Sequence, residues 1–213
     1  MSRTPLKIIG LTGGIGSGKS SVSRILRQYG ASVLDADALV HQLQSRGQLV
    51  WSVLFDAFGW PFFDADGRLA RRKMARHIFR NPTLRHELGD LIHPWVRQEL
   101  LRQMKALQAR GVTPIILDIP LLLESGWDQE VDEVWVIYAT VSQQRARIIE
   151  RDGLAPSEAD QRIQSQMALA QKVARADRVI NNTGSLDQLE REVRTLWEHI
   201  GDCAVTTESF VGS

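Results

Sequence analysis

The stretch GGIGSGKS, residues 13–20, has the residue types and spacing of a loop that holds phosphate. It satisfies the pattern G-x-x-x-x-G-K-[ST], with a short apolar run before it and a helical pattern after it. Glycines let the backbone turn tightly, so that its N–H groups and the start of the helix face phosphate oxygens. The pattern predicts nucleotide binding, but kinases, GTPases and motor ATPases all share it.

Two side chains of this loop have expected tasks. Lys19 is placed to reach the β- and γ-phosphates of a bound nucleotide, and Ser20 supplies a hydroxyl ligand for Mg²⁺. The alternative, a glycine-rich turn that binds nothing, fits poorly with the strand before the loop and the helix after it. The residues predicted to bind ATP here are Gly14, Ile15, Gly16, Ser17, Gly18, Lys19, Ser20 and Ser21.

Three carboxylates follow predicted strands. Asp35 and Asp37 come at the end of the second strand, and ligands bind beyond the carboxyl ends of strands in open α/β sheets. One of them is suited to orient or deprotonate an attacking hydroxyl, and the other to organise water around Mg²⁺. A turn with two solvated acids is the alternative. Asp118 lies near the end of the third strand and is a candidate metal partner, although the apolar run around it also has a purely structural explanation.

The elements that must position these residues alternate between strands and helices. Near-continuous apolar runs such as PIILDI and EVWVIYA predict strands buried on both faces, as in a parallel sheet. Helical patterns separate the strands, which predicts an α/β layered domain with right-handed crossovers. The predicted strands are residues 7–12, 32–34, 113–119, 133–138 and 178–180.

Local signals mark where several helices begin and end. Gly30 is expected just past the end of the first helix, and Ser185 with Gln188 forms a capping box before a last amphipathic helix that reaches Ile200. A long insertion follows the second strand, and we expect Asn81-Pro82 and His93-Pro94 to divide it into helical pieces. The polar residues 201–213 are expected to form a flexible tail.

Composition limits the classes of function. The 26 basic and 25 acidic residues leave a net charge of +1, so no overall field favours nucleic acid or a membrane surface. A single cysteine, Cys203, cannot form an internal disulfide, which is typical of a reducing compartment. The first residues lack a signal-peptide pattern and no run is long enough to span a membrane, so a cytoplasmic location is expected.

The order of its motifs resembles that of the dephospho-CoA kinases. The sequence contains GLTGGIGSGKSSV, DAD, IHP, IPLLLE and VINN in that order. Many nucleotide kinases share the loop, whereas LTGGIGSGK together with DAD, IHP and PLLLE is specific to this family. The resemblance covers nearly the whole chain. It implies an enzyme that transfers the γ-phosphoryl group of ATP to the ribose 3′-hydroxyl of dephospho-CoA, forming CoA.

The same resemblance implies an architecture in three parts. A P-loop kinase core built on a parallel sheet would comprise residues of about 5–40, 111–150 and 177–200. A helical insertion of about 41–110 would bind CoA, and a helical lid of about 151–176 would cover ATP. The partners of the protein would be dephospho-CoA and ATP, with ATP as the phosphoryl donor together with Mg²⁺. The resemblance does not imply an oligomeric state.

Several residues match family positions on the acceptor side. Asp37 matches the residue near the acceptor hydroxyl, and is our candidate for the base or orienting group. Packing within the fold remains an alternative for the other matches, including Arg71. The residues predicted to bind the acceptor are Asp35, Asp37, Arg71, His93, Leu121, Leu122 and Glu124.

On the donor side, Arg147 and Arg151 match the lid arginines of the family. They lie four residues apart on one helix face, which also suits a solvated surface. As lid residues, the two arginines would neutralise phosphate charge in the transition state. The predicted catalytic residues are Lys19, Asp37, Arg147 and Arg151. Asn182 matches the residue beside adenine, although NNTG is also good turn chemistry.

Three other functions share part of this pattern. Another nucleotide or nucleoside kinase would share the loop and the lid. A GTPase should carry an N-K-x-D or T-K-x-D guanine motif, and the sequence has neither. A nucleic-acid-dependent ATPase could bind its polynucleotide through the cations of the insertion. These cations, however, lie on several faces of a helix and have no aromatic residues between them that could stack on bases. The cations are Arg68, Arg71, Arg72, Lys73, Arg76 and Arg80.

Overall fold

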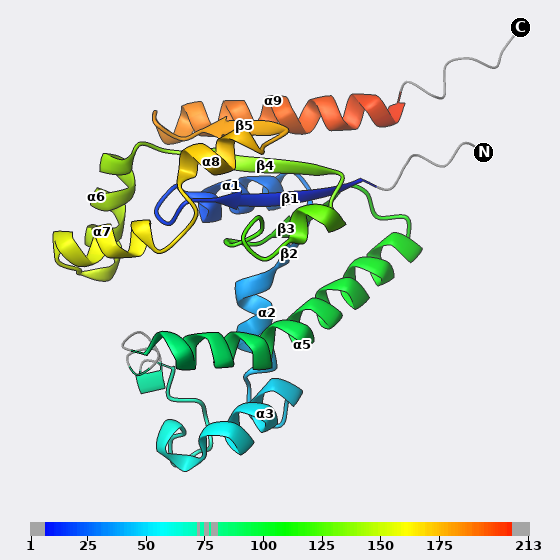
Figure 1. Ribbon diagram of the computed structural model, residues 1–213. Coiled ribbons are helices and arrows are strands. Elements are labelled where there is room, and N and C mark those ends of the chain that lie inside the picture. The colour runs from blue at the N-terminus through cyan, green and yellow to red at the C-terminus, as the bar shows by residue number, and fades with distance from the viewer. Residues whose placement is uncertain (1–6, 72, 75–76, 78–80, 206–213) are drawn as a thin grey trace, which may run out of the picture. The chain divides into compact units, whose positions relative to one another are not determined.

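The computed structural model describes residues 7–71, 73–74, 77 and 81–205 (Figure 1). The chain divides into two compact units. The first unit comprises the described residues up to Leu34 and those from Leu107 onward, and the second comprises Asp35–Ala106.

A five-stranded sheet forms the centre of the first unit. Its strands are β1 (Ile8–Gly13), β2 (Ser32–Asp35), β3 (Ile115–Asp118), β4 (Glu133–Tyr138) and β5 (Arg178–Asn181). The strand order is β2-β3-β1-β4-β5, and β1 pairs in parallel with β3 and β4, as β4 does with β5. All five strands fall on the predicted apolar runs, and the α/β parallel sheet is confirmed.

The core lies where helices α1 (Lys19–Gln28) and α9 (Leu186–Val205) pack against the sheet. Successive strand residues point to opposite faces, so Ile9 and Leu11 of β1 meet these helices while Gly10 faces away from them. The burial of β1 and β3 is complete along their lengths, as expected for central parallel strands. The core includes Val22, Ile25, Leu26, Ile116, Trp135, Ile137, Ile180, Leu189 and Val193.

The predicted ends of these two helices are confirmed in part. Gly30 follows α1 with φ of +86°, a left-handed conformation that glycine adopts readily. Gln188 N lies 3.3 Å from Ser185 Oγ, and Gln188 Oε1 lies 2.8 Å from Ser185 N, which completes the capping box. The predicted end at Ile200 is wrong, because α9 continues to Val205. A single glycine at 201 weakens a helix by only about 1 kcal/mol and does not end it; residues 206–213 of the predicted tail lie outside the described residues.

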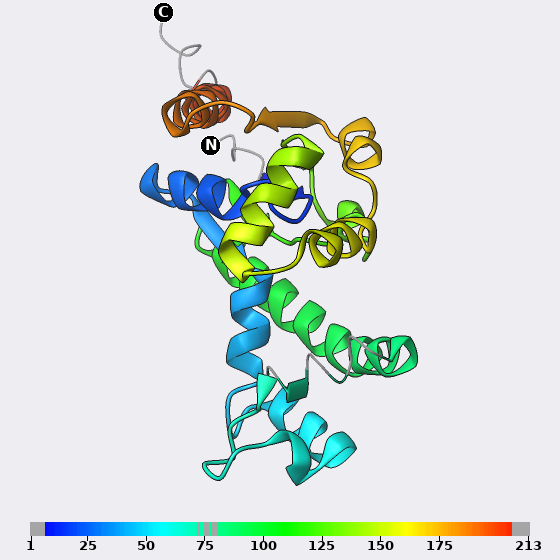
Figure 2. The same cartoon turned by 90° about the vertical axis from the view of Figure 1, so that its left-hand side faces the viewer.

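Three helices follow β4 within the first unit: α6 (Val141–Asp152), α7 (Pro156–Gln164) and α8 (Leu169–Ala174). Thr140 caps α6 in a capping box with Gln143, and Gly153 ends it with φ of +65°. In Figures 1 and 2, α6 and α7 lie at the end of the sheet where β1 runs into the phosphate loop. A short 3₁₀ turn, Trp127–Glu130, precedes β4.

The second unit is built around helices α2 (Ala36–Leu43), α3 (Leu49–Phe58) and α5 (Pro82–Ala109, which runs on into the first unit). Asn81 starts α5, since its side-chain oxygen accepts from the amides of Thr83 and Leu84. The predicted break at His93-Pro94 is wrong, because Pro94 lies inside α5. Proline removes one helical hydrogen bond but a long helix can absorb that loss by bending, and α5 bends along its length in Figure 1. None of the described helices, α5 included, combines the length and apolarity needed to cross a membrane.

Aromatic rings pack against one another around α3 of the second unit. Trp51 and Phe55 of α3 stack with ring centroids 5.2 Å apart, and Phe63 meets both rings edge-on. Trp51 Nε1 also donates to Gly67 O at 2.7 Å, which fixes the turn that carries the first residues of the basic run. These ring contacts add to a core of buried aliphatic and Met side chains in the same unit, which includes Val50, Leu54, Leu100 and Met104.

Candidate active site

The phosphate loop joins β1 to α1, and its shape depends on glycine at two positions. Gly16 and Gly18 have φ of +74° and +94°, in the left-handed region. A Cβ at Gly16 would lie 2.6 Å from the backbone oxygen of Gln144, and a Cβ at Gly18 would collide with the side-chain amide of Asn182. Ser17 N donates to Gly14 O at 2.9 Å, which closes the turn. The loop therefore has both the conformation and the close packing that only glycine permits.

The carbonyl groups of the loop are held by two side chains from elsewhere in the unit. Arg147 of α6 donates to Gly16 O and Ser17 O, each at 3.3 Å, and to Asn182 O at 3.0 Å. Asn182 Nδ2 donates to Ser17 O at 2.7 Å. Sequence reasoning missed this supporting role for both residues, because it depends on loop carbonyls that no motif describes. Their predicted contacts with ATP stay predictions.

Lys19 forms an ion pair with Asp118, the last residue of β3. Asp118 is only 2 % exposed, and its second oxygen accepts from the hydroxyl of Ser23, one turn after Lys19 on α1. A buried carboxylate is stable when it is paired and hydrogen-bonded in this way. The candidate metal partner and the loop lysine thus lie together, and Ser23 joins them as a residue that the loop pattern does not include.

The donor set of this site suits Mg²⁺ bound together with a nucleotide. Ser20 is exposed in the first turn of α1, and the carboxylate of Asp118 lies beside Lys19; Mg²⁺ prefers oxygen ligands of both kinds. No group of three or more His, Cys, Asp or Glu side chains gathers as a metal site within the described part of the chain.

Ser17 carries a further sign that the loop is built for a ligand. Ser17 is only 1 % exposed, and its hydroxyl has no hydrogen-bond partner among the described residues. Buried hydroxyls in folded proteins almost always have a partner, so an exception marks a place where a further group belongs. Ile15 N, in contrast, already donates to Gln166 Oε1 at 2.8 Å.

The structure does not bring Arg151 to the loop with Arg147. Arg151 is exposed at the end of α6 and forms two hydrogen bonds with Asp152, at 2.7 and 2.9 Å. This contact, together with the charge of Arg162, holds the pKa of the Asp152 carboxyl below its ordinary value. The i, i+4 spacing correctly places both arginines on one helix, but only Arg147 touches the loop.

The segment after β3 combines buried and exposed side chains. Leu122 is fully buried against Gly10 of β1, which leaves its side chain no surface for an acceptor, whereas Leu121 is 43 % exposed. Glu124 accepts from Met167 N at 3.1 Å and pairs with Lys172 at 2.8 Å. Lys172 was missed by the sequence patterns, which contain no signal for a buried lysine.

The other predicted acceptor residues belong to the second unit. Asp35 is the N-cap of α2 and accepts from Ala38 N at 2.9 Å, while Asp37 lies in the first turn of that helix. Arg71 donates to His41 O at 2.9 Å and to Gln44 Oε1 at 3.1 Å, so it fastens the segment after Gly67 to the end of α2. His93 is exposed on α5.

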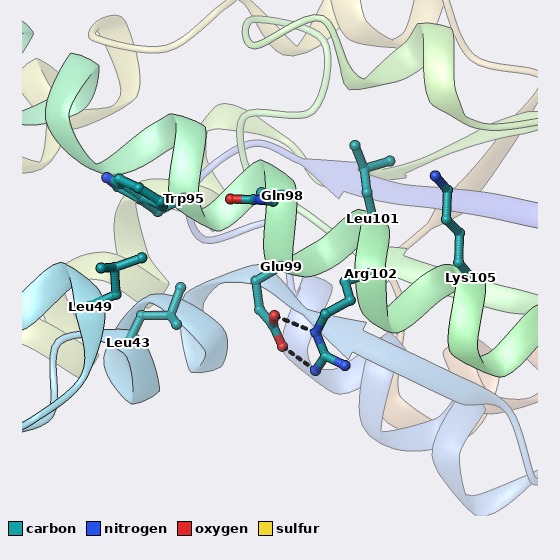
Figure 3. A pocket seen from close by; sticks show the side chains of 8 residues that line it. All are labelled: Leu43, Leu49, Trp95, Gln98, Glu99, Leu101, Arg102 and Lys105. Carbon is teal, nitrogen blue, oxygen red and sulfur yellow. Dashed lines mark hydrogen bonds and ion pairs between the residues drawn. The ribbon is translucent and has the colours of Figure 1, made fainter.

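The second unit also contains a pocket of about 540 Å³ along α5 (Figure 3). Glu99 and Arg102 form a two-pronged ion pair there, with both hydrogen bonds 2.7 Å long. These bonds lower the pKa of Glu99 to about 2. The pocket is lined by Leu43, Leu49, Trp95, Gln98, Glu99, Leu101, Arg102 and Lys105.

Comparison with known proteins identifies the family. The family model described as Dephospho-CoA kinase matches residues 7–188, which include the phosphate loop, Asp118, Glu124, Lys172 and Asn182. The chain belongs to the dephospho-CoA kinase family. The resemblance inferred from the motifs is therefore confirmed.

Comparison with individual proteins supports the same family. The chain is 47 % identical over 192 residues to the dephospho-CoA kinase of Symbiobacterium thermophilum, covering 90 % of this chain and 80 % of that one. Among solved structures, it is similar to a Thermus thermophilus protein with a TM-score of 0.76 and 35 % identity, over 92 % and 98 % of the two chains. The dephospho-CoA kinase from Campylobacter jejuni gives a TM-score of 0.69 at 27 % identity, over 92 % and 97 %.

In this dephospho-CoA kinase family member, Gly16→Ala should weaken ATP binding roughly 10- to 100-fold, because the substitution combines left-handed strain with a backbone clash. Titration calorimetry with ATP measures the effect. Gly30→Ala is the matched control, since Gly30 has φ of +86° but no atom within 4 Å of an added Cβ. It should lower stability by about 1–2 kcal/mol and leave ATP affinity unchanged. Wild-type affinity in Gly16→Ala would contradict the assigned role of the loop.

The pKa of Glu99 gives a second test. Arg102→Gln should raise this pKa from about 2 toward the ordinary value of 4.5, because the hydrogen-bonding guanidinium is lost. The pair stabilises the fold above pH 4.5 and loses that contribution as the pH falls toward 2. An NMR titration of the carboxyl carbon reports the change. Lys105→Gln, in the same pocket, should leave the pKa of Glu99 unaltered; equal shifts in both variants would refute the assignment to Arg102.

Proposed function

We propose that this protein transfers the γ-phosphoryl group of ATP to the ribose 3′-hydroxyl of dephospho-CoA, forming CoA and ADP. The family match over residues 7–188, joined to a phosphate loop whose lysine lies against a carboxylate at the end of β3, carries this proposal. The loop supplies the donor site, and the family supplies the identity of the acceptor.

On the donor side, the loop amides and Lys19 hold the β- and γ-phosphates. Lys19 exchanges part of its contact with Asp118 for phosphate oxygens, because both are anions within reach of one ammonium. Ser20 and Asp118 are the residues suited to hold Mg²⁺, which when bound neutralises charge on the β- and γ-phosphates. Arg147 and Arg151 are proposed as further positive charge near the phosphates, and Asn182 as a neighbour of adenine.

On the acceptor side, Asp37 orients the 3′-hydroxyl and accepts its proton. The hydroxyl oxygen forms a bond to the γ-phosphorus as the bond to the leaving oxygen of ADP breaks, and this reaction depends mainly on positioning and charge. Asp35 caps α2 and so fixes the turn that carries Asp37. Arg71, His93, Leu121, Leu122 and Glu124 are proposed to line the acceptor site, Leu122 through its backbone.

The proposed division of the chain follows from these roles. Residues of about 41–110 form the helical insertion that binds CoA, and the pocket along α5 in Figure 3 offers cationic and aromatic groups for it. Residues of about 151–176 form the lid over ATP. A cytoplasmic location, with small molecules and no nucleic acid as partners, completes the proposal.

An assay of ADP release with several acceptors tests this function. Dephospho-CoA should give rapid turnover, while AMP, adenosine, shikimate and water alone should give little, because only the first carries the whole CoA skeleton. Lys19→Ala should abolish transfer, since the loop lysine acts as a charge on the phosphates, and circular dichroism checks that the variant folds without the ion pair to Asp118. A preference for another acceptor would replace the proposed function by that of a different nucleotide or nucleoside kinase, and stimulation by polynucleotide would contradict both.

Asp37→Asn separates a chemical role from a binding role. The variant should lower kcat by about 100-fold or more with ATP affinity retained, if Asp37 accepts or orients the hydroxyl proton. Steady-state kinetics with dephospho-CoA and ATP measure kcat and KM separately. Asp187→Asn, an exposed acid in the first turn of α9, is the control and should leave both unchanged. A change confined to the KM for the acceptor would make Asp37 a binding residue.

A further inference from the structure

Lys172 of α8 is a charged side chain with 0 % exposure to solvent. Its ammonium lies 2.8 Å from Glu124 Oε1, 3.1 Å from Pro120 O and 3.4 Å from Gly13 O. An ammonium has three N–H donors, so these acceptors account for all of them. The motifs that identify the phosphate loop and the acceptor segment leave this residue without a role.

The three contacts join three segments that are distant in sequence. Gly13 ends β1 and begins the phosphate loop, whereas Pro120 and Glu124 belong to the segment that leaves β3. Pro120 O also accepts from Thr12 Oγ1 at 2.9 Å, and Glu124 Oε1 also accepts from Met167 N at 3.1 Å. The ammonium therefore lies at the centre of a network that ties the start of the loop to the exit of β3.

That exit carries a residue of direct importance to the donor site. Asp118, which pairs with Lys19, precedes Pro120 by two residues. A shift of Pro120 relative to Gly13 would therefore move Asp118 relative to the loop. The segment that ends in Lys172 makes a second contact with the loop, because Gln166 Oε1 accepts from Ile15 N at 2.8 Å.

Stability alone is a poor explanation for a charge at this position. Moving an ammonium and a carboxylate out of water is unfavourable, and well-packed apolar residues often replace such pairs without loss of stability. A fully hydrogen-bonded charge does, however, fix the distances and directions of its partners in a way that an apolar side chain does not. The geometry of the loop and the β3 exit is what such a charge can specify.

We propose that Lys172 is a positioning residue for phosphoryl transfer. It touches neither substrate, and it acts through Gly13 and through the Pro120–Glu124 segment by setting where the loop lies relative to Asp118. This inference rests on the proposed function, because its main readout is transfer to dephospho-CoA. It also predicts a property of the loop itself that can be measured without any acceptor.

Lys172→Met, which keeps the length of the side chain and removes the ammonium, is the principal test. It should lower kcat for dephospho-CoA about 10- to 100-fold while ATP affinity changes less than about threefold, because misplacement of reacting groups mainly affects the chemical step. Hydrogen exchange of the amides of residues 13–18 should become faster. Activity is expressed per folded molecule, and the number of folded molecules is obtained from the stoichiometry of ATP binding.

Arg175→Met is the matched control. Arg175 follows α8 directly and forms an ion pair with Asp128 at 2.7 Å, but this pair is at the surface. Its loss should leave kcat and loop exchange as in wild type. Equal kinetic losses in both variants would overturn the proposal, because the effect would then belong to any disturbance of α8.

Two more variants keep the test decisive if Lys172→Met does not fold. Lys172→Gln has fewer N–H donors and no charge, and its kcat should be at least about fivefold lower than that of wild type. Lys172→Arg keeps the charge and should keep more activity than Lys172→Gln. Wild-type kcat and loop exchange in every folded variant would show that Lys172 only packs. If wild-type protein did not phosphorylate dephospho-CoA, the proposed function would fail, and loop exchange in Lys172→Met would still test the positioning role.

Discussion

A phosphate loop that is packed into the fold needs hydrogen-bond donors for its buried carbonyl groups as well as free N–H groups for a nucleotide. In this protein that need is met by side chains from three other segments. Arg147 and Asn182 bind the carbonyls of Gly16 and Ser17, and Lys172 binds that of Gly13. Arg147 also donates to the backbone oxygen of Asn182, and Lys172 is also paired with Glu124. The shape of the loop therefore depends on two cations and one amide that bind its carbonyl groups and that come from three other parts of the first unit.

The ion pair between Lys19 and Asp118 fixes a proposed catalytic side chain, as the donors to the carbonyl groups fix the loop backbone. Asp118 is buried and also bonded to Ser23, so the lysine has a defined position before any nucleotide arrives. A lysine held in this way needs little reorganisation when phosphate oxygens replace part of the carboxylate contact. Phosphoryl transfer asks the protein for positioning and charge more than for covalent chemistry, and this arrangement supplies both.

The two compact units have different physical characters, which suits different tasks. The first is an α/β sheet with a continuous aliphatic core, rigid enough to hold the loop, Asp118 and Asn182 at the ends of parallel strands. The second is helical, with buried aliphatic side chains and a cluster of aromatic rings around Trp51 and Phe55, and with the ion pair of Glu99 and Arg102 in its pocket. A helical insertion that forms its own compact unit can vary its surface for a substrate without altering the phosphate site.

The sequence by itself determined the parallel sheet, its strands, the first helix with Gly30 at its end and the capping box of Ser185, because these are local patterns of apolar period and turn chemistry. It also determined the family through motifs in a fixed order. It failed at Pro94 and Gly201, where a long helix tolerated residues that usually end one. Only the tertiary structure decided that Arg147 and Asn182 support the loop, that Arg151 does not reach it, and that Lys172 is buried against Gly13 and Glu124. These facts depend on which backbone carbonyls and carboxylates meet a side chain across 35 to 165 residues of sequence, and spacing along the chain contains no information about such meetings.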